Sequence, residues 1–264
     1  MENSIREKGY AILDLSGLEY FKSIQDMLHQ HFPCAPTELH QHESMSHEQR
    51  CCWIKEAKDA LAKSNFFYSL LKENLDIFIK LLGPDIDMQS GPYLRVARPN
   101  LDEDAIGWHR DTFYGNSFWE CNLWMPVFPL EKESGLLVIE GSHAKPSTNT
   151  RYITEKNSFR REVIKGSIAN EIGYLYASKT DDIISECENQ PSMARLLTPK
   201  LGQAIFFFGY LAHCPYNASA RTRVTIDSRL KSMSAATNTK QGYYRPLTRG
   251  SIGDCVEHMM RLNM

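Results

Sequence analysis

Three side chains of types that bind metal ions stand at a spacing that suits a single ion. His109 and Asp111 are two residues apart in the segment GWHRDTFYG, and His213 follows a very apolar run much later in the chain. In an extended segment, residues i and i+2 project from the same face, so the imidazole and the carboxylate can reach one ion. Two imidazoles and one carboxylate form the facial triad of non-haem Fe(II) oxygenases, which leaves coordination positions open. The sequence therefore predicts a metal site at these three residues.

A His-x-Asp pair alone is more typical of a surface or hydrogen-bonded pair than of a metal site, and the later segment ARTRVTIDSRL is what favours the metal site. If this segment is a strand, its charged residues share one face and its apolar residues the other. Arg223 and Thr225 would then present a guanidinium and a hydroxyl to one carboxylate. The plainer alternative pairs Arg223 with Asp227 or a surface acid, and Arg221 and Arg229 share its parity.

The elements that must position these residues change character along the chain. Helical spacing of apolar residues follows a short expected strand, whereas short apolar or alternating runs bounded by Gly, Pro or charges begin near residue 87. The sequence therefore predicts helices in front of an all-β core. The expected strand covers 7–15, the expected helices cover 18–31 and 48–82 with a break near Ser64, and the expected β segments are MQSGPYLRVA, CNLWMPVF, GLLVIEGS, QAIFFFGYLAHC and RVTIDSRL.

We expect one domain over residues 1–264, because the chain contains no internal repeat, low-complexity tract or flexible linker. The expected parts are a mostly helical support (1–86), a β core (87–144 and 201–232) and an insertion (145–200). The insertion is polar and rich in both charge signs. A connection of this length inside a compact domain is typical of a functional lid.

The composition is that of a soluble globular protein, with 42% hydrophobic and 23% charged residues. A formal net charge of -2 gives no reason to expect nucleic acid or an anionic membrane as partner, so a small molecule is favoured. Neither a bilayer-spanning apolar run nor a secretory signal is apparent. Seven cysteines without a paired framework suit reduced thiols, so we expect a cytoplasmic protein, with its oligomeric state left open.

Taken together, the motifs resemble the Fe(II)/2-oxoglutarate-dependent dioxygenases of the phytanoyl-CoA dioxygenase superfamily. The segments that carry the resemblance, in order, are EKGYAILDL, PYLRVARP, GWHRD, CNLWMPVFPLEKESGLLVIEGSHAKPS and GQAIFFFGYLAHCPYNASARTRVTIDSRL. The resemblance implies a mainly β protein with flanking helices, built on a double-stranded β-helix (jelly-roll, cupin-like) core. It also implies that His109, Asp111 and His213 bind iron, that Arg223 with Thr225 holds the distal carboxylate of 2-oxoglutarate, and that His143 is structural.

The reaction implied by the resemblance uses Fe(II), 2-oxoglutarate and O2. Oxidative decarboxylation of 2-oxoglutarate to succinate and CO2 would be coupled to C–H hydroxylation of a polar small molecule. In the related halogenases a small residue replaces the carboxylate ligand, whereas this chain retains Asp111, so hydroxylation is favoured over halogenation. Desaturation and ring formation stay open.

Other residues have a place in the predicted site by their position in the motifs. For the co-substrate these are Asn122 on CNLWMPVF and Tyr93 on PYLRV, with a satisfied core polar group as the alternative. For the substrate, basic and aromatic residues near the metal motif suggest a polar or anionic molecule in an aromatic-walled cleft, although such aromatics are often core residues. The expected substrate residues are Arg95, Trp108, Arg110 and Tyr114.

Two other functions, a binding protein and a zinc hydrolase, predict different features in the sequence. A non-catalytic jelly-roll binding protein would have lost a ligand or the carboxylate-binding arginine, and neither is missing. A zinc-dependent hydrolase could use the same His/Asp/His site, but it would leave Arg223 and Thr225 without a task. Cys214 stands where relatives have Gly, so its thiol either tunes the site or points away. The histidines and cysteines of the first third lack a zinc-finger framework.

Overall fold

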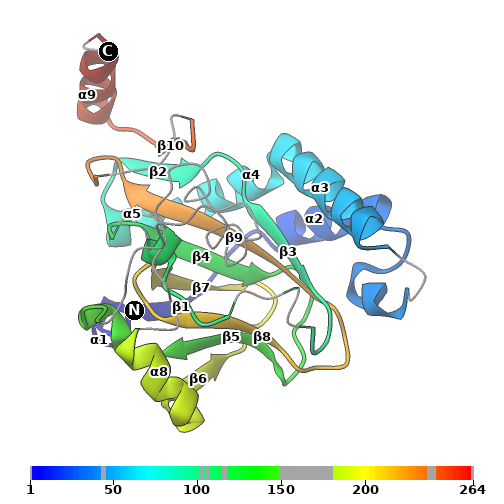
Figure 1. The fold of residues 1–264 in the computed structure, drawn as a ribbon. Coiled ribbons are helices and arrows are strands. Elements are labelled where there is room, and N and C mark those ends of the chain that lie inside the picture. Colours follow the sequence, from blue (N-terminus) through cyan, green and yellow to red (C-terminus); the bar gives the residue numbers. More distant parts are fainter. Residues whose placement is uncertain are drawn as a thin grey trace.

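Two β-sheets face each other in the computed structural model, which describes residues 2–42, 46–101, 104, 107–114, 118–148, 181–236 and 242–262 (Figure 1). The larger sheet has seven strands in the order β1-β7-β4-β9-β2-β10, with β3 pairing beside β2 on β9, and the smaller sheet has the order β6-β5-β8. The strands are β1 (Tyr10–Asp14), β2 (Ile86–Gln89), β3 (Tyr93–Ala97), β4 (Cys121–Pro126), β5 (Ser134–Ile139), β6 (Ala194–Leu197), β7 (Gln203–Phe208), β8 (His213–Asn217), β9 (Arg223–Ser232) and β10 (Tyr244–Thr248).

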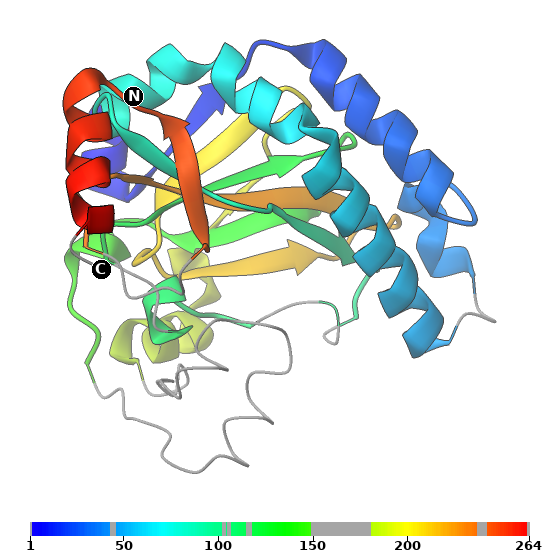
Figure 2. The same ribbon diagram turned by 90° about the horizontal axis from the view of Figure 1, so that it is seen from above.

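Helices cover the outer face of the larger sheet, as Figure 2 shows for the N-terminal group. A capping box formed by Ser46 and Gln49 begins α3, and Asn65, with a positive φ of 59°, separates α3 from α4. No described helix is long and apolar enough to cross a membrane. The helices are α1 (Glu2–Lys8), α2 (Leu18–His31), α3 (His47–Ser64), α4 (Phe66–Glu73), α5 (Leu75–Leu82), α8 (Asp182–Asn189) and α9 (Ser251–Leu262).

Strand alternation divides the interior into two layers. On β9, the apolar residues Val224, Ile226 and Leu230 join the core between the larger sheet and the helices. Trp124 of β4 and Phe207 of β7 face the opposite way and pack between the two sheets. Because successive strand residues project to opposite faces, the charged residues of β9 must point between the sheets. The structure therefore confirms the expected alternation of ARTRVTIDSRL and places its charges in the barrel interior.

The predicted fold class is confirmed: a mainly antiparallel β-helix core carries a helical N-terminal part. The predicted break in the 48–82 helix is also found, at Asn65, with a second break at Asn74. MQSGPYLRVA forms two strands, β2 and β3, because a turn at Gly91 interrupts it. The sequence patterns did not predict α1, β6, β10 or α9.

Two strands lie outside the ranges expected for the β core. Residues 194–197 form β6, which pairs with β5 as a strand of the smaller sheet, so the expected insertion ends before this point. Residues 244–248 form β10, which extends the larger sheet beyond residue 232. Residues 149–180, the central part of the proposed lid, lie outside the described residues.

Close approach of β6 to β5 gives a test of the barrel. A Cβ atom at Gly135 would meet the carbonyl oxygen of Leu197 at 2.1 Å, so Gly135→Ala must push the strands apart. Such overpacking costs about 1–3 kcal/mol, and we expect the melting temperature to fall by roughly 5 °C. Gly91→Ala is the matched control, because its Cβ would make only an ordinary 3.8 Å contact. Equal melting temperatures for the two variants would contradict this packing.

Candidate metal centre

His109 and His213 are paired through their backbones although they are far apart in the sequence. The amide of His109 donates to the carbonyl of His213 at 3.0 Å, and the amide of His213 donates to the carbonyl of His109 at 2.9 Å. This is a single antiparallel bridge at the start of β8. Side chains of directly opposed residues in such a pair lie on the same face, and the two imidazole centroids are 4.2 Å apart.

Each imidazole is oriented by a carbonyl two residues before it. Nδ1 of His109 lies 2.7 Å from the carbonyl oxygen of Gly107, and Nδ1 of His213 lies 2.8 Å from that of Leu211. When Nδ1–H donates to these carbonyls, each Nε2 keeps its lone pair for an ion. Burial, together with the neighbouring His109, lowers the pKa of His213 to about 3, so its ring is neutral at physiological pH.

Asp111 completes the cluster from a short turn. It begins a 3-10 turn (Asp111–Tyr114), and its amide donates to the carbonyl of Gly209 at 2.8 Å. Its Oδ1 lies 3.5 Å from Nε2 of His109 and 3.8 Å from Nε2 of His213. The two side chains therefore come together through a β-bridge at His109 and a turn at Asp111, whereas the argument from the two-residue spacing assumed an extended segment.

The predicted triad forms one compact set of donors. Ligand atoms of His109, Asp111 and His213 lie within 4.8 Å of one another, and all three residues are buried. It is the only such group of His, Cys, Asp or Glu among the residues that the structure describes. A buried set of two imidazoles and one carboxylate fits a divalent transition metal with open coordination positions.

The second oxygen of Asp111 is held by two protein groups. Nδ2 of Asn122 and Nη2 of Arg229 each donate to Oδ2 at 2.8 Å. Burial alone would raise the pKa of Asp111, but the Arg229 guanidinium and the two imidazoles hold it well below its usual range. The carboxylate is therefore ionised with Oδ1 turned toward the histidines. Asn122, expected at the co-substrate, uses its amide group to orient this carboxylate.

Arg223 and Thr225 contribute polar groups that lack a matching partner in the described protein. Nη1 of Arg223 donates to the carbonyls of Gly135 (2.7 Å) and Tyr216 (2.9 Å), and no described carboxylate pairs with the guanidinium. Burial lowers its pKa to about 10, so it remains a cation. Nε of Arg223 and Oγ1 of Thr225 are both buried without a hydrogen-bond partner among the described residues. Such atoms in a native protein call for an explanation, and a bound ligand is one.

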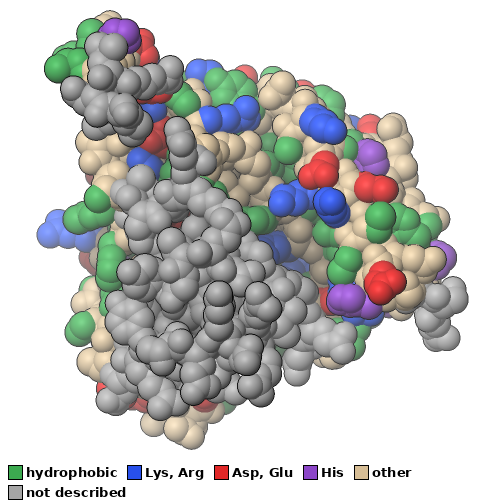
Figure 3. Space-filling view, turned by 45° about the horizontal axis from the view of Figure 1, so that its top comes forward, with side chains coloured by type: hydrophobic (Ala, Val, Ile, Leu, Met, Phe, Trp, Pro, Cys, Tyr) green, Lys and Arg blue, Asp and Glu red, His purple; other side chains and the backbone are tan. Residues whose placement is uncertain are grey.

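Tyr93 and Arg95 lie on β3, which pairs with β9. Tyr93 is opposite Asp227, and Arg95 is opposite Thr225. The Tyr93 ring lies beneath the Arg229 guanidinium, at 5.2 Å, so it sits nearer the Asp111 end of β9 than the Arg223 end. Nε of Arg95 pairs with Asp227 at 3.0 Å, and its side chain is 31% exposed. Several Lys and Arg side chains lie close together on the face seen in Figure 3.

Of the other expected substrate residues, Arg110 does not face the candidate site, which corrects the expectation for it. Its neighbours His109 and Asp111 point toward the candidate metal centre, whereas its own side chain points away and is fully buried. It donates to the carbonyls of Ser142 and Tyr210 and pairs with Asp181 at 3.4 Å. Arg110 is therefore a structural cation. Half-buried Trp108 packs against the apolar cluster beside α8, and the Tyr114 side chain lies outside the described residues.

His143 and Cys214 lie beside the cluster without adding to its ligand atoms. His143 stacks on Phe208 at 5.4 Å, and its Nε2 lies 3.1 Å from the carbonyl of Arg6, in line with the structural role expected for it. Cys214 follows His213 on β8, so alternation directs its side chain to the opposite face. Its thiol therefore points away from the ligand atoms.

Sequence reasoning missed two residues of the centre. Arg229 was considered only as a rival for the co-substrate carboxylate, and the structure gives it Asp111 instead. Glu120, the residue before β4, is 1% exposed with Oε1 3.7 Å from Nε of Arg229, and burial raises its pKa to about 7. Its position before an apolar strand carried no signal of this contact.

No family model and no curated protein matches the chain, so the resemblance to the phytanoyl-CoA dioxygenase superfamily stays a prediction. Solved structures do match it over nearly its whole length. The non-haem monooxygenase ThoJ in its apo form has a TM-score of 0.58 at 12% identity, covering 95% of this chain and 84% of that one.

Two further matches carry ligands. ThoJ in a nickel complex has a TM-score of 0.54 at 12% identity, with 95% and 84% of the two chains covered. EvdO2 from Micromonospora carbonacea var. aurantiaca, complexed with 2-oxoglutarate, has a TM-score of 0.55 at 15% identity, with 91% and 93% covered. At these identities the likeness concerns the fold. The chain therefore has the double-stranded β-helix architecture that these proteins share.

Proposed function

We propose that this protein is a non-haem iron oxygenase that couples decarboxylation of 2-oxoglutarate to hydroxylation of a polar small molecule. The observation that carries the proposal is the buried His109/Asp111/His213 cluster on a barrel that also contains Arg223, a buried cation without a described carboxylate partner. Solved proteins of the same fold are a monooxygenase, also seen with nickel, and a protein complexed with 2-oxoglutarate.

The donor set suits Fe(II). His109 and His213 would each offer Nε2, and Asp111 would offer Oδ1 while Arg229 and Asn122 retain Oδ2. Three ligands on one side of the ion leave positions for a chelating co-substrate and for O2. When bound, iron and 2-oxoglutarate supply the oxidising chemistry, in which O2 converts 2-oxoglutarate to succinate and CO2 and a substrate C–H bond is hydroxylated.

The residues of the chain provide binding and orientation. Arg223 would hold the distal carboxylate of 2-oxoglutarate through its Nε edge, and the Thr225 hydroxyl would donate to the same carboxylate. This ligand would fill the hydrogen-bonding capacity that both buried groups leave unused. The Trp124 ring, 5.6 Å from the guanidinium carbon, provides an apolar wall that excludes water.

The identity of Asp111 bears on the type of oxidation. A halogenase needs an open position for halide where a carboxylate would otherwise stand, whereas here the carboxylate is held in place by an ion pair and an amide. Hydroxylation is therefore the reaction that we propose. A zinc hydrolase with the same triad would leave the buried Arg223 charge unexplained.

Loss of a ligand should remove both metal and turnover. For His109→Ala and Asp111→Ala, we expect bound iron, measured by metal analysis, and succinate formation both to fall to background. His143→Ala is the matched control, because this half-buried histidine stacks on Phe208 outside the cluster. Full succinate formation in either triad variant would remove that residue from the metal site.

Arg223 should control the requirement for 2-oxoglutarate without affecting iron. Hydrogen bonds to a charged group contribute about 1.5–3 kcal/mol, so we expect Arg223→Ala to raise the concentration needed for half-maximal succinate release roughly 10- to 100-fold. Iron content should stay as in the unmodified protein. Arg221→Ala is the control, since this arginine has the same parity but an exposed side chain. If only Arg221→Ala raised the 2-oxoglutarate concentration needed for half-maximal release, Arg221 and not Arg223 would be the residue that binds the carboxylate.

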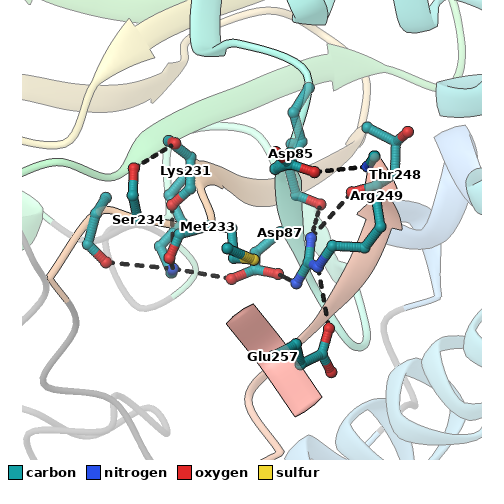
Figure 4. Close-up of polar contacts among 12 residues, drawn as sticks. Asp85, Asp87, Lys231, Met233, Ser234, Thr248, Arg249 and Glu257 are labelled. Atoms are coloured by element: carbon teal, nitrogen blue, oxygen red, sulfur yellow. Dashed lines mark hydrogen bonds and ion pairs between the residues drawn. The ribbon is translucent and has the colours of Figure 1, made fainter. Parts of the chain in front are cut away.

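Arg229 should act on iron affinity through Asp111. Residues that orient a ligand typically change metal affinity 10- to 100-fold, and we expect Arg229→Gln to weaken Fe(II) binding by about that factor. Arg249→Gln is the control, because Arg249 also pairs with a buried aspartate, Asp87, in a network with Lys231 and Glu257 away from the triad (Figure 4). Equal iron affinity in the two variants would show that Arg229 only stabilises the fold.

A further inference from the structure

Three cations surround one aromatic ring at the edge of the proposed active site. Nζ of Lys58 on α3 lies 5.4 Å from the Tyr93 ring centroid, and the guanidinium carbons of Arg95 and Arg229 lie at 4.7 and 5.2 Å. A ring face attracts a cation, but three like charges gathered at one ring also repel one another. The cluster therefore needs negative charge nearby.

The described acids provide only part of that charge. Arg229 pairs with both Asp111 and Asp227, and Arg95 shares the same Asp227 at 3.0 Å. Lys58 forms no ion pair with any described residue. One carboxylate thus serves two guanidinium groups, and the ammonium group of Lys58 has none.

The proposed cofactors do not correct this imbalance. A divalent ion and the dianion of 2-oxoglutarate are balanced by Asp111 and Arg223, so this part of the site is neutral. Asp227 then remains against Arg95, Arg229 and Lys58. Glu120 adds at most a partial charge, because its burial raises its pKa to about 7. The loaded site therefore keeps an excess of positive charge beside Tyr93.

The cations that lack full compensation are the accessible ones. Arg229 is buried, whereas the Arg95 side chain is 31% exposed and Lys58 is half-buried. A continuous series of ion pairs, from Asp111 through Arg229 and Asp227, links the metal ligand to Arg95. Lys58 and Arg95 therefore lie on the solvent-accessible side of this series of ion pairs, where we expect a substrate to approach.

We propose, on the basis of the function proposed above, that the substrate carries an anionic oxygen group bound between Lys58 and Arg95 beside the Tyr93 ring. The group is a carboxylate or a phosphate, both of which accept hydrogen bonds from ammonium and guanidinium donors. The remaining part of the molecule would extend toward the metal. Tyr93 is then a platform for the substrate-binding cations and does not bind the co-substrate.

The test uses inorganic phosphate and acetate as separate probes, titrated into the full chain by calorimetry. One series uses protein loaded with nickel and 2-oxoglutarate, so that Arg223 is already occupied, and the other uses protein without either. We expect saturable binding of at least one probe in both series. Lys58→Gln and Arg95→Gln should each weaken it tenfold or more, whereas Lys63→Gln, on the exposed face of the same helix, should bind as the unmodified protein does.

The outcomes separate the two proposals. Binding of phosphate alone or of acetate alone supports the inference and identifies the group. Binding of neither probe to the unmodified chain, or unchanged binding in Lys58→Gln, overturns it. Failure of the oxygenase proposal would appear separately, as absent nickel and 2-oxoglutarate binding in the loaded series with probe binding retained in the other.

Discussion

The mutual backbone hydrogen bonds of His109 and His213 are the constraint on which the centre depends. They join a loop before β4 to the start of β8 and place two imidazoles on one face. Without this pairing, the two histidines would be separated by the whole intervening chain. The Gly209 carbonyl then fixes Asp111 beside them, so three backbone hydrogen bonds define the positions of the three candidate ligands. The barrel provides a rigid frame for these contacts.

A second layer of interactions sets the charge of the centre. Arg229 extends between Asp111 and Asp227, and Asp227 continues to Arg95. Arg229 and Asp111 are both buried, so loss of either partner would leave a costly unpaired charge in the interior. This series of ion pairs thus connects the orientation of Asp111 to the partly exposed Arg95. Arg223, at the other end of β9, stands outside this series, which leaves it free for an anionic ligand.

Local patterns predicted much of this arrangement. Alternation in ARTRVTIDSRL correctly separated the core residues of β9 from its charges, and the His-x-Asp pair with His213 identified the ligand cluster. The patterns failed where pairing is non-local: β6 and β10 are short strands whose partners are distant, and Asp111 lies in a turn. Arg110 was expected to contact substrate because it lies beside the metal motif in the sequence, whereas its side chain is buried against Ser142, Tyr210 and Asp181. Arg229 could not be assigned because its partner lies on another element.

The central claim is that the cluster of His109, Asp111 and His213 binds Fe(II) and that 2-oxoglutarate chelates the bound ion. Anaerobic addition of Fe(II) and 2-oxoglutarate, followed by visible absorption spectroscopy, tests the claim most directly. The account predicts a weak metal-to-ligand charge-transfer band that is absent without either component and absent in His109→Ala. Absence of the band in the unmodified protein, with zinc retained through purification, would contradict it.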